Sequence, residues 1–262
     1  MRVMFPVPRI TESFIDGVIE TLRWKRYVDI REPIEGELNA DYVSPNEVLE
    51  LKIFEEEGLE KSERQSKIAT LYERFTTDKG IVDLELDQAP IEIRRELDAL
   101  VSRPLQTAVK KASKQIRQSA KALNMDGAGV LIGVNNGYSY LNAGNFENLL
   151  VRRCRNDSTN IDHAACITVN YHQGDFDAFV FCTVRCHTIL GGPEWCEFQR
   201  FQEAVVGAFN NAMGQMMADQ MNPKLWDESL SPVIDIRFER NGVMYVREAP
   251  HVPDSRFAKT EI

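Results

Sequence analysis

The sequence predicts an α/β fold in which a mixed central sheet is flanked by helices, with an additional helix and a hairpin near the C-terminus. Segments with helical hydrophobic spacing alternate with short apolar runs bounded by glycine, asparagine or proline, which is the pattern of strands joined by helices. The 262 residues are 43% hydrophobic, enough for one sizeable core. No repeat or Pro/Gly-rich linker separates a second domain.

The elements can be assigned in chain order. Thr11 can cap a helix whose apolar residues recur at helical spacing as far as Trp24. Near the other end, Asn241-Gly242 between two apolar runs is a strong hairpin signal. Between them, the pattern predicts helices over 60–75, 107–123, 146–154 and 197–217, and strands over 127–135, 164–171, 176–184, 232–238 and 243–246.

One further hairpin is predicted to bring charged side chains together. Residues 44–47 form a polar break between two apolar runs, as in a four-residue hairpin loop. The pairing that this loop favours sets Asp41 opposite Glu50, with Cβ atoms about 4.5–5.5 Å apart. Lys52, two residues beyond Glu50, points to the same face.

This grouping is typical of metal-dependent hydrolysis. Two carboxylates so close repel each other unless a cation lies between them, and a hard divalent cation with oxygen ligands is the usual solution. A lysine beside them could orient or deprotonate a metal-bound water. A half-exposed strand with a solvated face would explain the same residues, because charged and apolar positions alternate here.

The same residues carry a family resemblance. A hairpin with Asp41, followed by the strand Val48-Leu49-Glu50-Leu51-Lys52 and a charged helix, resembles the PD-(D/E)xK nuclease superfamily, which has the restriction-endonuclease-like fold. The resemblance implies that Asp41, Glu50 and the Leu51 carbonyl bind Mg²⁺, with Mn²⁺ able to substitute, and that Lys52 serves the attacking water. Ala40 stands where the named pattern has a proline.

The resemblance also implies a single nuclease-like domain over 1–262, with a motif-bearing core at about 10–185 and a C-terminal extension at about 190–262. Gln65, on the helix after the motif, is a candidate catalytic residue because some members use a glutamine there. An extra acidic residue could come from the first helix, where Glu12, Asp16 and Glu20 are candidates. For each of them, and for Gln65, an ordinary solvated helix face is the competing interpretation.

Charge gives conflicting indications about nucleic acid. The formal net charge of −9 provides no general attraction to phosphate. Between Arg94 and Asn124, however, eight basic residues stand against two acidic ones. The predicted helix within this segment carries a stripe that would contact phosphates or simply face solvent, formed by Lys110, Lys114, Arg117 and Lys121.

The expected function is therefore Mg²⁺-dependent hydrolysis of phosphodiester bonds in nucleic acid, with DNA favoured over RNA and a role in defence or restriction suggested by the resemblance. Cleavage of both strands by a chain with one site would favour a homodimer. No apolar run reaches the length of a membrane span, and a cytoplasmic location is expected. The alternative is a non-catalytic acidic interaction protein built on a nuclease-like scaffold.

Overall fold

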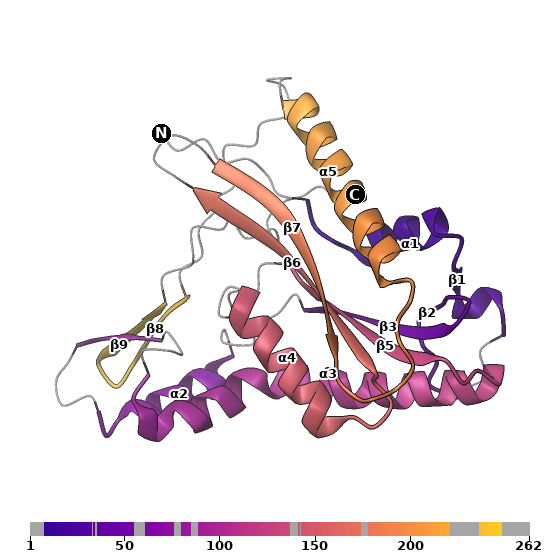
Figure 1. Ribbon diagram of the computed structural model, residues 1–262. Helices are drawn as coiled ribbons and strands as arrows, with labels where there is room; N and C mark the ends of the chain where they lie inside the picture. Colours follow the sequence, from indigo (N-terminus) through magenta and orange to yellow (C-terminus); the bar gives the residue numbers. More distant parts are fainter. Residues whose placement is uncertain are drawn as a thin grey trace.

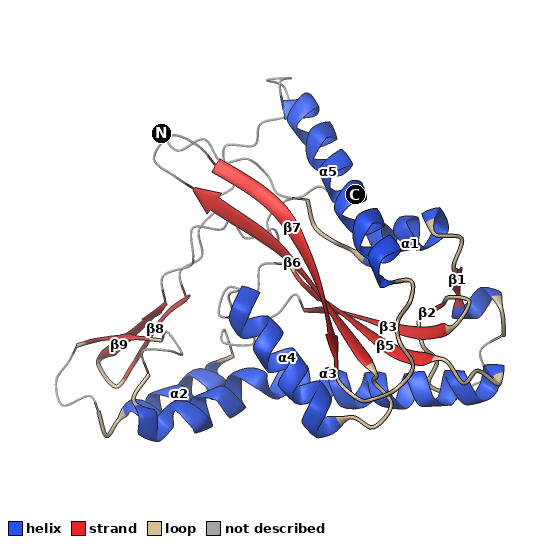
Figure 2. Cartoon of the chain, viewed as in Figure 1, coloured by secondary structure: helices blue, strands red, loops and turns tan. Residues whose placement is uncertain are grey.

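A computed structural model describes residues 8–32, 34, 36–54, 61–75, 80–84, 89–136, 141, 143–173, 178–220 and 236–247 (Figures 1 and 2). The helices are α1 (Glu12–Thr21), the 3-10 helix η1 (Tyr27–Asp29), α2 (Ser62–Tyr72), α3 (Ile91–Leu123), α4 (Ala143–Asp157) and α5 (Phe198–Gln220). The strands are β1 (Lys25–Arg26), β2 (Tyr42–Val43), β3 (Glu47–Phe54), β4 (Ile81–Asp83), β5 (Ala128–Asn135), β6 (His163–Gln173), β7 (Ala178–Thr188), β8 (Ile236–Arg240) and β9 (Val243–Arg247).

The main sheet is mixed, as predicted, and has the strand order β1-β2-β3-β5-β6-β7. The pairs β1·β2, β2·β3 and β6·β7 are antiparallel, whereas β3·β5 and β5·β6 are parallel. Parallel neighbours need long crossover connections, which α3 and α4 supply. A second sheet has the order β4-β9-β8.

Two hydrophobic clusters occupy the two faces of the main sheet. One contains apolar side chains of α1 and α5, including Ile15 and Phe209, packed on Leu49 of β3. The other contains side chains of α2, α3 and α4 together with β8 and β9, so the second sheet shares its core. Figure 1 shows the same layers, with α1 and α5 on one side of the sheet and α3 and α4 on the other. Consecutive residues of β3 therefore point alternately toward α3 and toward α1 and α5.

The predicted capping and turn signals are present. The Thr11 side chain accepts a 3.1 Å hydrogen bond from the Phe14 amide at the start of α1. Asn241 and Gly242 both have positive φ, 55° and 77°, as a tight hairpin turn between β8 and β9 requires. Expected elements at both ends of the chain are thus confirmed.

Several elements differ in length from the prediction. The helix α3 begins at Ile91 rather than near Thr107 and runs through Pro104. The helix α4 extends beyond its expected apolar stretch at both ends, and β6 and β7 are longer than expected because they pair with each other from His163 to Gln173. The strand β4 was not expected. It is three residues long and pairs with β9, a partner far away in the sequence.

The predicted turn after Gln173 lies mostly outside the described residues, as do residues 60, 176 and 177 and residues 232–235 of the expected elements. Among the helices of the described chain, none is both long and apolar enough to cross a membrane.

Candidate functional site

The hairpin register sets Asp41 opposite Glu50. Tyr42 pairs with Leu49 and Val43 pairs with Val48, which is the predicted pairing. Continuing this antiparallel register by one residue aligns Asp41 with Glu50, and the Asp41 carboxylate lies near enough to raise the pKa of Glu50. The predicted placement of the two acids opposite each other is therefore present.

The Asp41 carboxylate is also held by the backbone of β3. The Leu51 amide donates a 2.7 Å hydrogen bond to Asp41 Oδ2. Because the N–H and C=O of one strand residue project from the same edge, the Leu51 carbonyl also faces the edge beside Asp41. Strand β2 begins at Tyr42, which pairs with Leu49, so β2 does not pair with the part of β3 beyond Leu49. The Asp41 carboxylate and the Leu51 carbonyl thus share this edge of β3, next to Glu50.

Glu50 lies in an unfavourable environment for a charged carboxylate. Its side chain is fully buried. Burial, and next the neighbouring Asp41 carboxylate, raise the pKa of Glu50 to about 8, against the opposing effect of Lys52. Burial also raises the pKa of Asp41, although the Leu51 amide and Lys52 act in the opposite direction. Glu50 Oε2 is buried and has no hydrogen-bond partner. Such an atom is a ready ligand for a cation.

Lys52 lies on the same face of β3 and contacts the acid pair directly. Its ammonium group forms an ion pair with Glu50 Oε1, and it donates a 3.3 Å hydrogen bond to Gln115 Oε1 on α3. Gln115 in turn donates a 2.7 Å hydrogen bond from Nε2 to the Asn39 carbonyl. The Lys52 side chain is 19% exposed, so water reaches the site at this residue.

Gln115, rather than Gln65, is the glutamine that touches Lys52. Gln65 lies on α2, where its Oε1 accepts a 2.9 Å hydrogen bond from Arg240 of β8. The charge pattern of the sequence marks residue 115 only as part of a basic helix. The signal that would have identified it is its position: it is polar, but it lies beside the apolar stripe that includes Ala112 and Ile116.

The acidic candidates of α1 have other partners. Glu12 forms an ion pair with Arg26 of β1. Asp16 accepts a 2.9 Å hydrogen bond from the Tyr42 hydroxyl and lies 3.3 Å from Arg26 Nε. Tyr42 packs in the cluster beneath α1, on the face of the sheet opposite Glu50. These contacts favour a structural role for Glu12 and Asp16; Glu20 is exposed.

A second buried glutamate on β3 provides a useful comparison. Glu47 is fully buried, its pKa is raised by burial, and its Oε1 has no hydrogen-bond partner. Its other oxygen accepts a hydrogen bond from the Ser44 hydroxyl in the hairpin loop. Glu47 is therefore as buried as Glu50, but neither Asp41 nor Lys52 is among its contacts.

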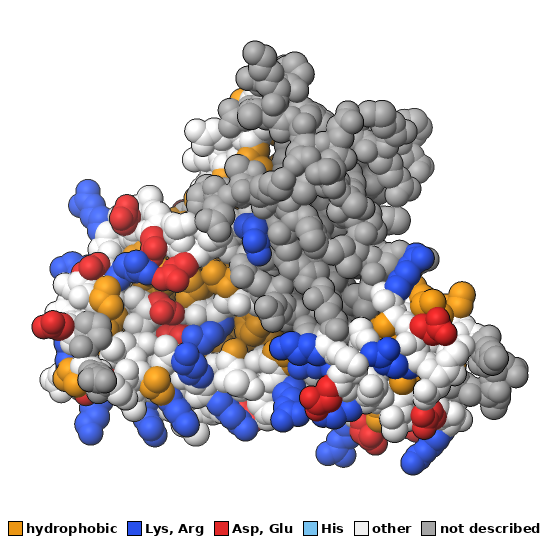
Figure 3. Space-filling view, turned by 180° about the vertical axis from the view of Figure 1, so that it is seen from behind, with side chains coloured by type: hydrophobic (Ala, Val, Ile, Leu, Met, Phe, Trp, Pro, Cys, Tyr) orange, Lys and Arg blue, Asp and Glu red, His pale blue; other side chains and the backbone are white. Residues whose placement is uncertain are grey.

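The predicted basic residues all lie on the exposed surface of α3. Figure 3 shows Lys and Arg side chains along the lower edge of the molecule, where α3 runs in Figure 1. Lys110 lies 3.5 Å from Asp157 of α4. Among the described residues, the other members of the stripe form no ion pair: Lys114, Arg117 and Lys121.

The residues around Asp41 and Glu50 are compatible with a divalent cation. Asp41, Glu50 and the Leu51 carbonyl supply oxygen ligands, which Mg²⁺ and Mn²⁺ prefer, and the unpartnered Glu50 oxygen lacks a protein donor. Within the described residues, no group of three or more His, Cys, Asp or Glu side chains is arranged to hold a metal, so the carbonyl and water would complete the coordination. Comparisons with protein-family models, with curated proteins and with solved structures found no match.

Proposed function

We propose that this protein is a Mg²⁺-dependent nuclease that hydrolyses phosphodiester bonds in DNA, and that it belongs to the PD-(D/E)xK superfamily. The observation that carries the proposal is the contact between Asp41 and Glu50, with the Lys52 ammonium on the same face and a buried Glu50 oxygen without a partner. An ion pair with Lys52 requires only one carboxylate. A second carboxyl group beside the buried Glu50 is costly unless a proton or a further cation neutralises the pair.

The topology gives independent support for the superfamily. A helix, α1, precedes three antiparallel strands, and β3 then pairs in parallel with β5 after the crossover through α3. Asp41 immediately precedes the second strand of this unit, and Glu50, Leu51 and Lys52 lie on the third. This is the placement that the resemblance in the sequence implies.

Each residue has a distinct role in the proposed reaction. Asp41, Glu50 and the Leu51 carbonyl would hold Mg²⁺, which when bound stabilises charge on the scissile phosphate and lowers the pKa of water. The Leu51 amide orients Asp41 through its hydrogen bond to Oδ2. Lys52 would orient the attacking water or accept its proton, and Gln115 would hold Lys52 in place. Basic residues on the exposed surface of α3 that form no ion pair within the described part of the chain, such as Lys114 and Arg117, would contact phosphates without reading sequence.

The proposal is tested by cleavage of duplex DNA in the presence of Mg²⁺ and, separately, Mn²⁺. The wild-type protein should cleave, and Asp41→Ala and Lys52→Ala should each abolish cleavage while retaining the far-ultraviolet circular dichroism of the wild type. Glu47→Gln is the matched control, since it changes a buried glutamate on the same strand outside the proposed site. Undiminished cleavage by both site variants would contradict the proposal, and absence of cleavage by the wild type would favour the non-catalytic alternative.

A further inference from the structure

The two long edges of α3 face different neighbours. On one edge, Gln118 accepts a 2.9 Å hydrogen bond from the Leu38 amide, and Gln115 contacts Asn39 and Lys52. Residues 118 and 115 are three apart, so they lie on the same side of the helix. This edge therefore faces the candidate active site.

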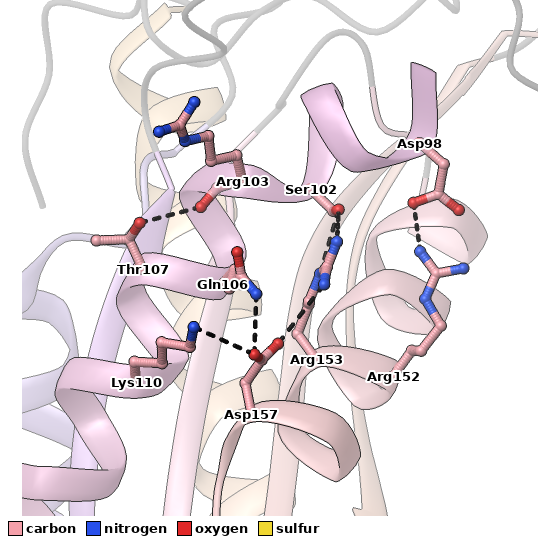
Figure 4. A network of polar contacts seen from close by, with 9 residues as sticks. All are labelled: Asp98, Ser102, Arg103, Gln106, Thr107, Lys110, Arg152, Arg153 and Asp157. Carbon is pink, nitrogen blue, oxygen red and sulfur yellow. Dashed lines mark hydrogen bonds and ion pairs between the residues drawn. The ribbon is translucent and has the colours of Figure 1, made fainter. Parts of the chain in front are cut away.

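The opposite edge packs on α4. Gln106 donates a 2.9 Å hydrogen bond to Asp157 Oδ1, and Lys110, four residues later, lies 3.5 Å from the same oxygen. Arg153 of α4 contacts Ser102 of α3 through a 2.5 Å hydrogen bond. Figure 4 shows these side chains directed into the groove between the two helices, with Lys110 turned toward Asp157. The Lys110 ammonium therefore takes part in the contact between α3 and α4.

Lys111 is next to Lys110 in the sequence but lies on the other edge. It precedes Gln115 by four residues, so it lies one helical turn away on the same side of α3. Along this side of α3, Gln118 contacts Leu38, Gln115 contacts Lys52, and Lys111 follows one turn farther toward the start of the helix. Lys111 is exposed and forms no ion pair or hydrogen bond among the described residues.

An unpaired basic side chain such as Lys111 would favour the approach of a polyanion to this site. Asp41 and Glu50 are acidic, the Lys52 ammonium is paired with Glu50, and Arg26 is paired with Glu12. A phosphate backbone approaching the site would therefore find both of these basic side chains already paired with carboxyl groups. The exposed ammonium of Lys111, one turn from Gln115, is an unpaired cation next to them among the described residues.

We propose that Lys111 is a substrate-positioning residue that contacts a backbone phosphate of duplex DNA beside the Asp41–Glu50 pair. This inference rests on the proposed nuclease function and makes it more specific: it divides the basic surface of α3 into a substrate side, which includes Lys111, and a structural side, which includes Lys110. The two lysines are adjacent, identical in type and both exposed, so they form a matched pair for an experiment.

The test is binding of a fluorescently labelled DNA duplex by the full chain in the presence of a chelator, measured by anisotropy at several salt concentrations. Lys111→Ala should weaken binding about three- to tenfold and reduce the slope of log K against log salt by about 1, as expected for the loss of one phosphate contact. Lys111→Arg should restore both values. Lys110→Ala should change affinity by less than about twofold.

Equal effects of the two alanine variants, no effect of either, or no binding by the wild type would overturn the assignment of Lys111. Because the measurement excludes divalent metal, it is independent of the cleavage assay. Cleavage by the wild type together with unchanged binding by Lys111→Ala would reject the inference and leave the nuclease proposal in place. Loss of binding in Lys111→Ala without any cleavage by the wild type would reject the nuclease proposal and retain the phosphate contact.

Discussion

The Leu51 amide donates a 2.7 Å hydrogen bond to Asp41 Oδ2. This bond connects β3 to the residue just before β2, beyond the Tyr42–Leu49 pair at which the ladder of the hairpin stops. The bond fixes the Asp41 carboxylate beside Glu50 and uses a backbone group that β2 leaves unpaired. It also favours the ionised form of Asp41, in opposition to burial. The chemistry expected at this site therefore depends on where the β2–β3 ladder ends.

The raised pKa of Glu50 predicts that the metal-free protein loses stability as pH increases from about 5 to about 8. In this interval the unfolded chain has released the Glu50 proton, whereas the folded protein keeps it. The folded state binds more protons, so Glu50 contributes a loss of at most about 1.4 kcal/mol per pH unit. Urea unfolding at pH 5.5, 6.5 and 7.5 measures this slope. Glu50→Gln should flatten it, leaving the contributions of Glu47 and Asp41, and a variant slope equal to that of the wild type would contradict the prediction.

Divalent metal should stabilise the wild-type protein. At a concentration one hundred times the dissociation constant, Mg²⁺ or Mn²⁺ should add about 2.7 kcal/mol to the free energy of unfolding, seen as an increase in melting temperature. Because the metal requires ionised carboxylates, the increase should be greater at pH 8 than at pH 6. Asp41→Asn and Glu50→Gln should abolish the response, whereas Glu47→Gln should retain it. Loss of the metal-induced increase in melting temperature in all three variants would contradict specific binding of the metal at Asp41 and Glu50.

Substitution of Gln115 should impair cleavage much more than substitution of Gln65. Gln115→Ala removes the hydrogen bond that holds the Lys52 ammonium, and misplacement of a catalytic group typically lowers the rate by about 10- to 100-fold. Gln65→Ala removes a contact to Arg240 and should leave kcat/KM within about twofold of the wild type. Steady-state cleavage kinetics, with melting curves to establish folding, compare the two. A greater loss for Gln65→Ala would restore Gln65 as the catalytic candidate.

Asp157 should matter for stability and not for DNA binding. Its side chain is 11% exposed. As Figure 4 shows, its carboxylate accepts a hydrogen bond from Gln106 and forms ion pairs with Lys110 and Arg153. Asp157→Ala leaves the partly buried Gln106 and Arg153 without their acceptor and should cost about 1–3 kcal/mol in urea unfolding. Asp98→Ala is the control, because Asp98 pairs with the half-exposed Arg152 and its loss should cost under about 1 kcal/mol. Equal losses would contradict the central role given to Asp157.

The fold and the hairpin were largely predictable because they depend on local patterns. The apolar spacing after Thr11 and the turn at Asn241-Gly242 each specify one element over a few residues. The pairing of Asp41 with Glu50 follows from a loop length and a two-residue period. The strand β4 could not be foreseen, since its three residues acquire their hydrogen bonds from β9, which lies far away in the sequence.

The sequence by itself determined which strand carries Glu50 and Lys52 and that Asp41 would face them, because strand period and loop length are local properties. Only the tertiary structure decided that Gln115 contacts Lys52, that Glu50 is fully buried, and that Lys110 lies beside Asp157 of α4. These features depend on how α3 lies on the sheet and against α4. Packing orientation is set by contacts between side chains distant in the sequence, and a hydrophobic repeat alone does not specify it.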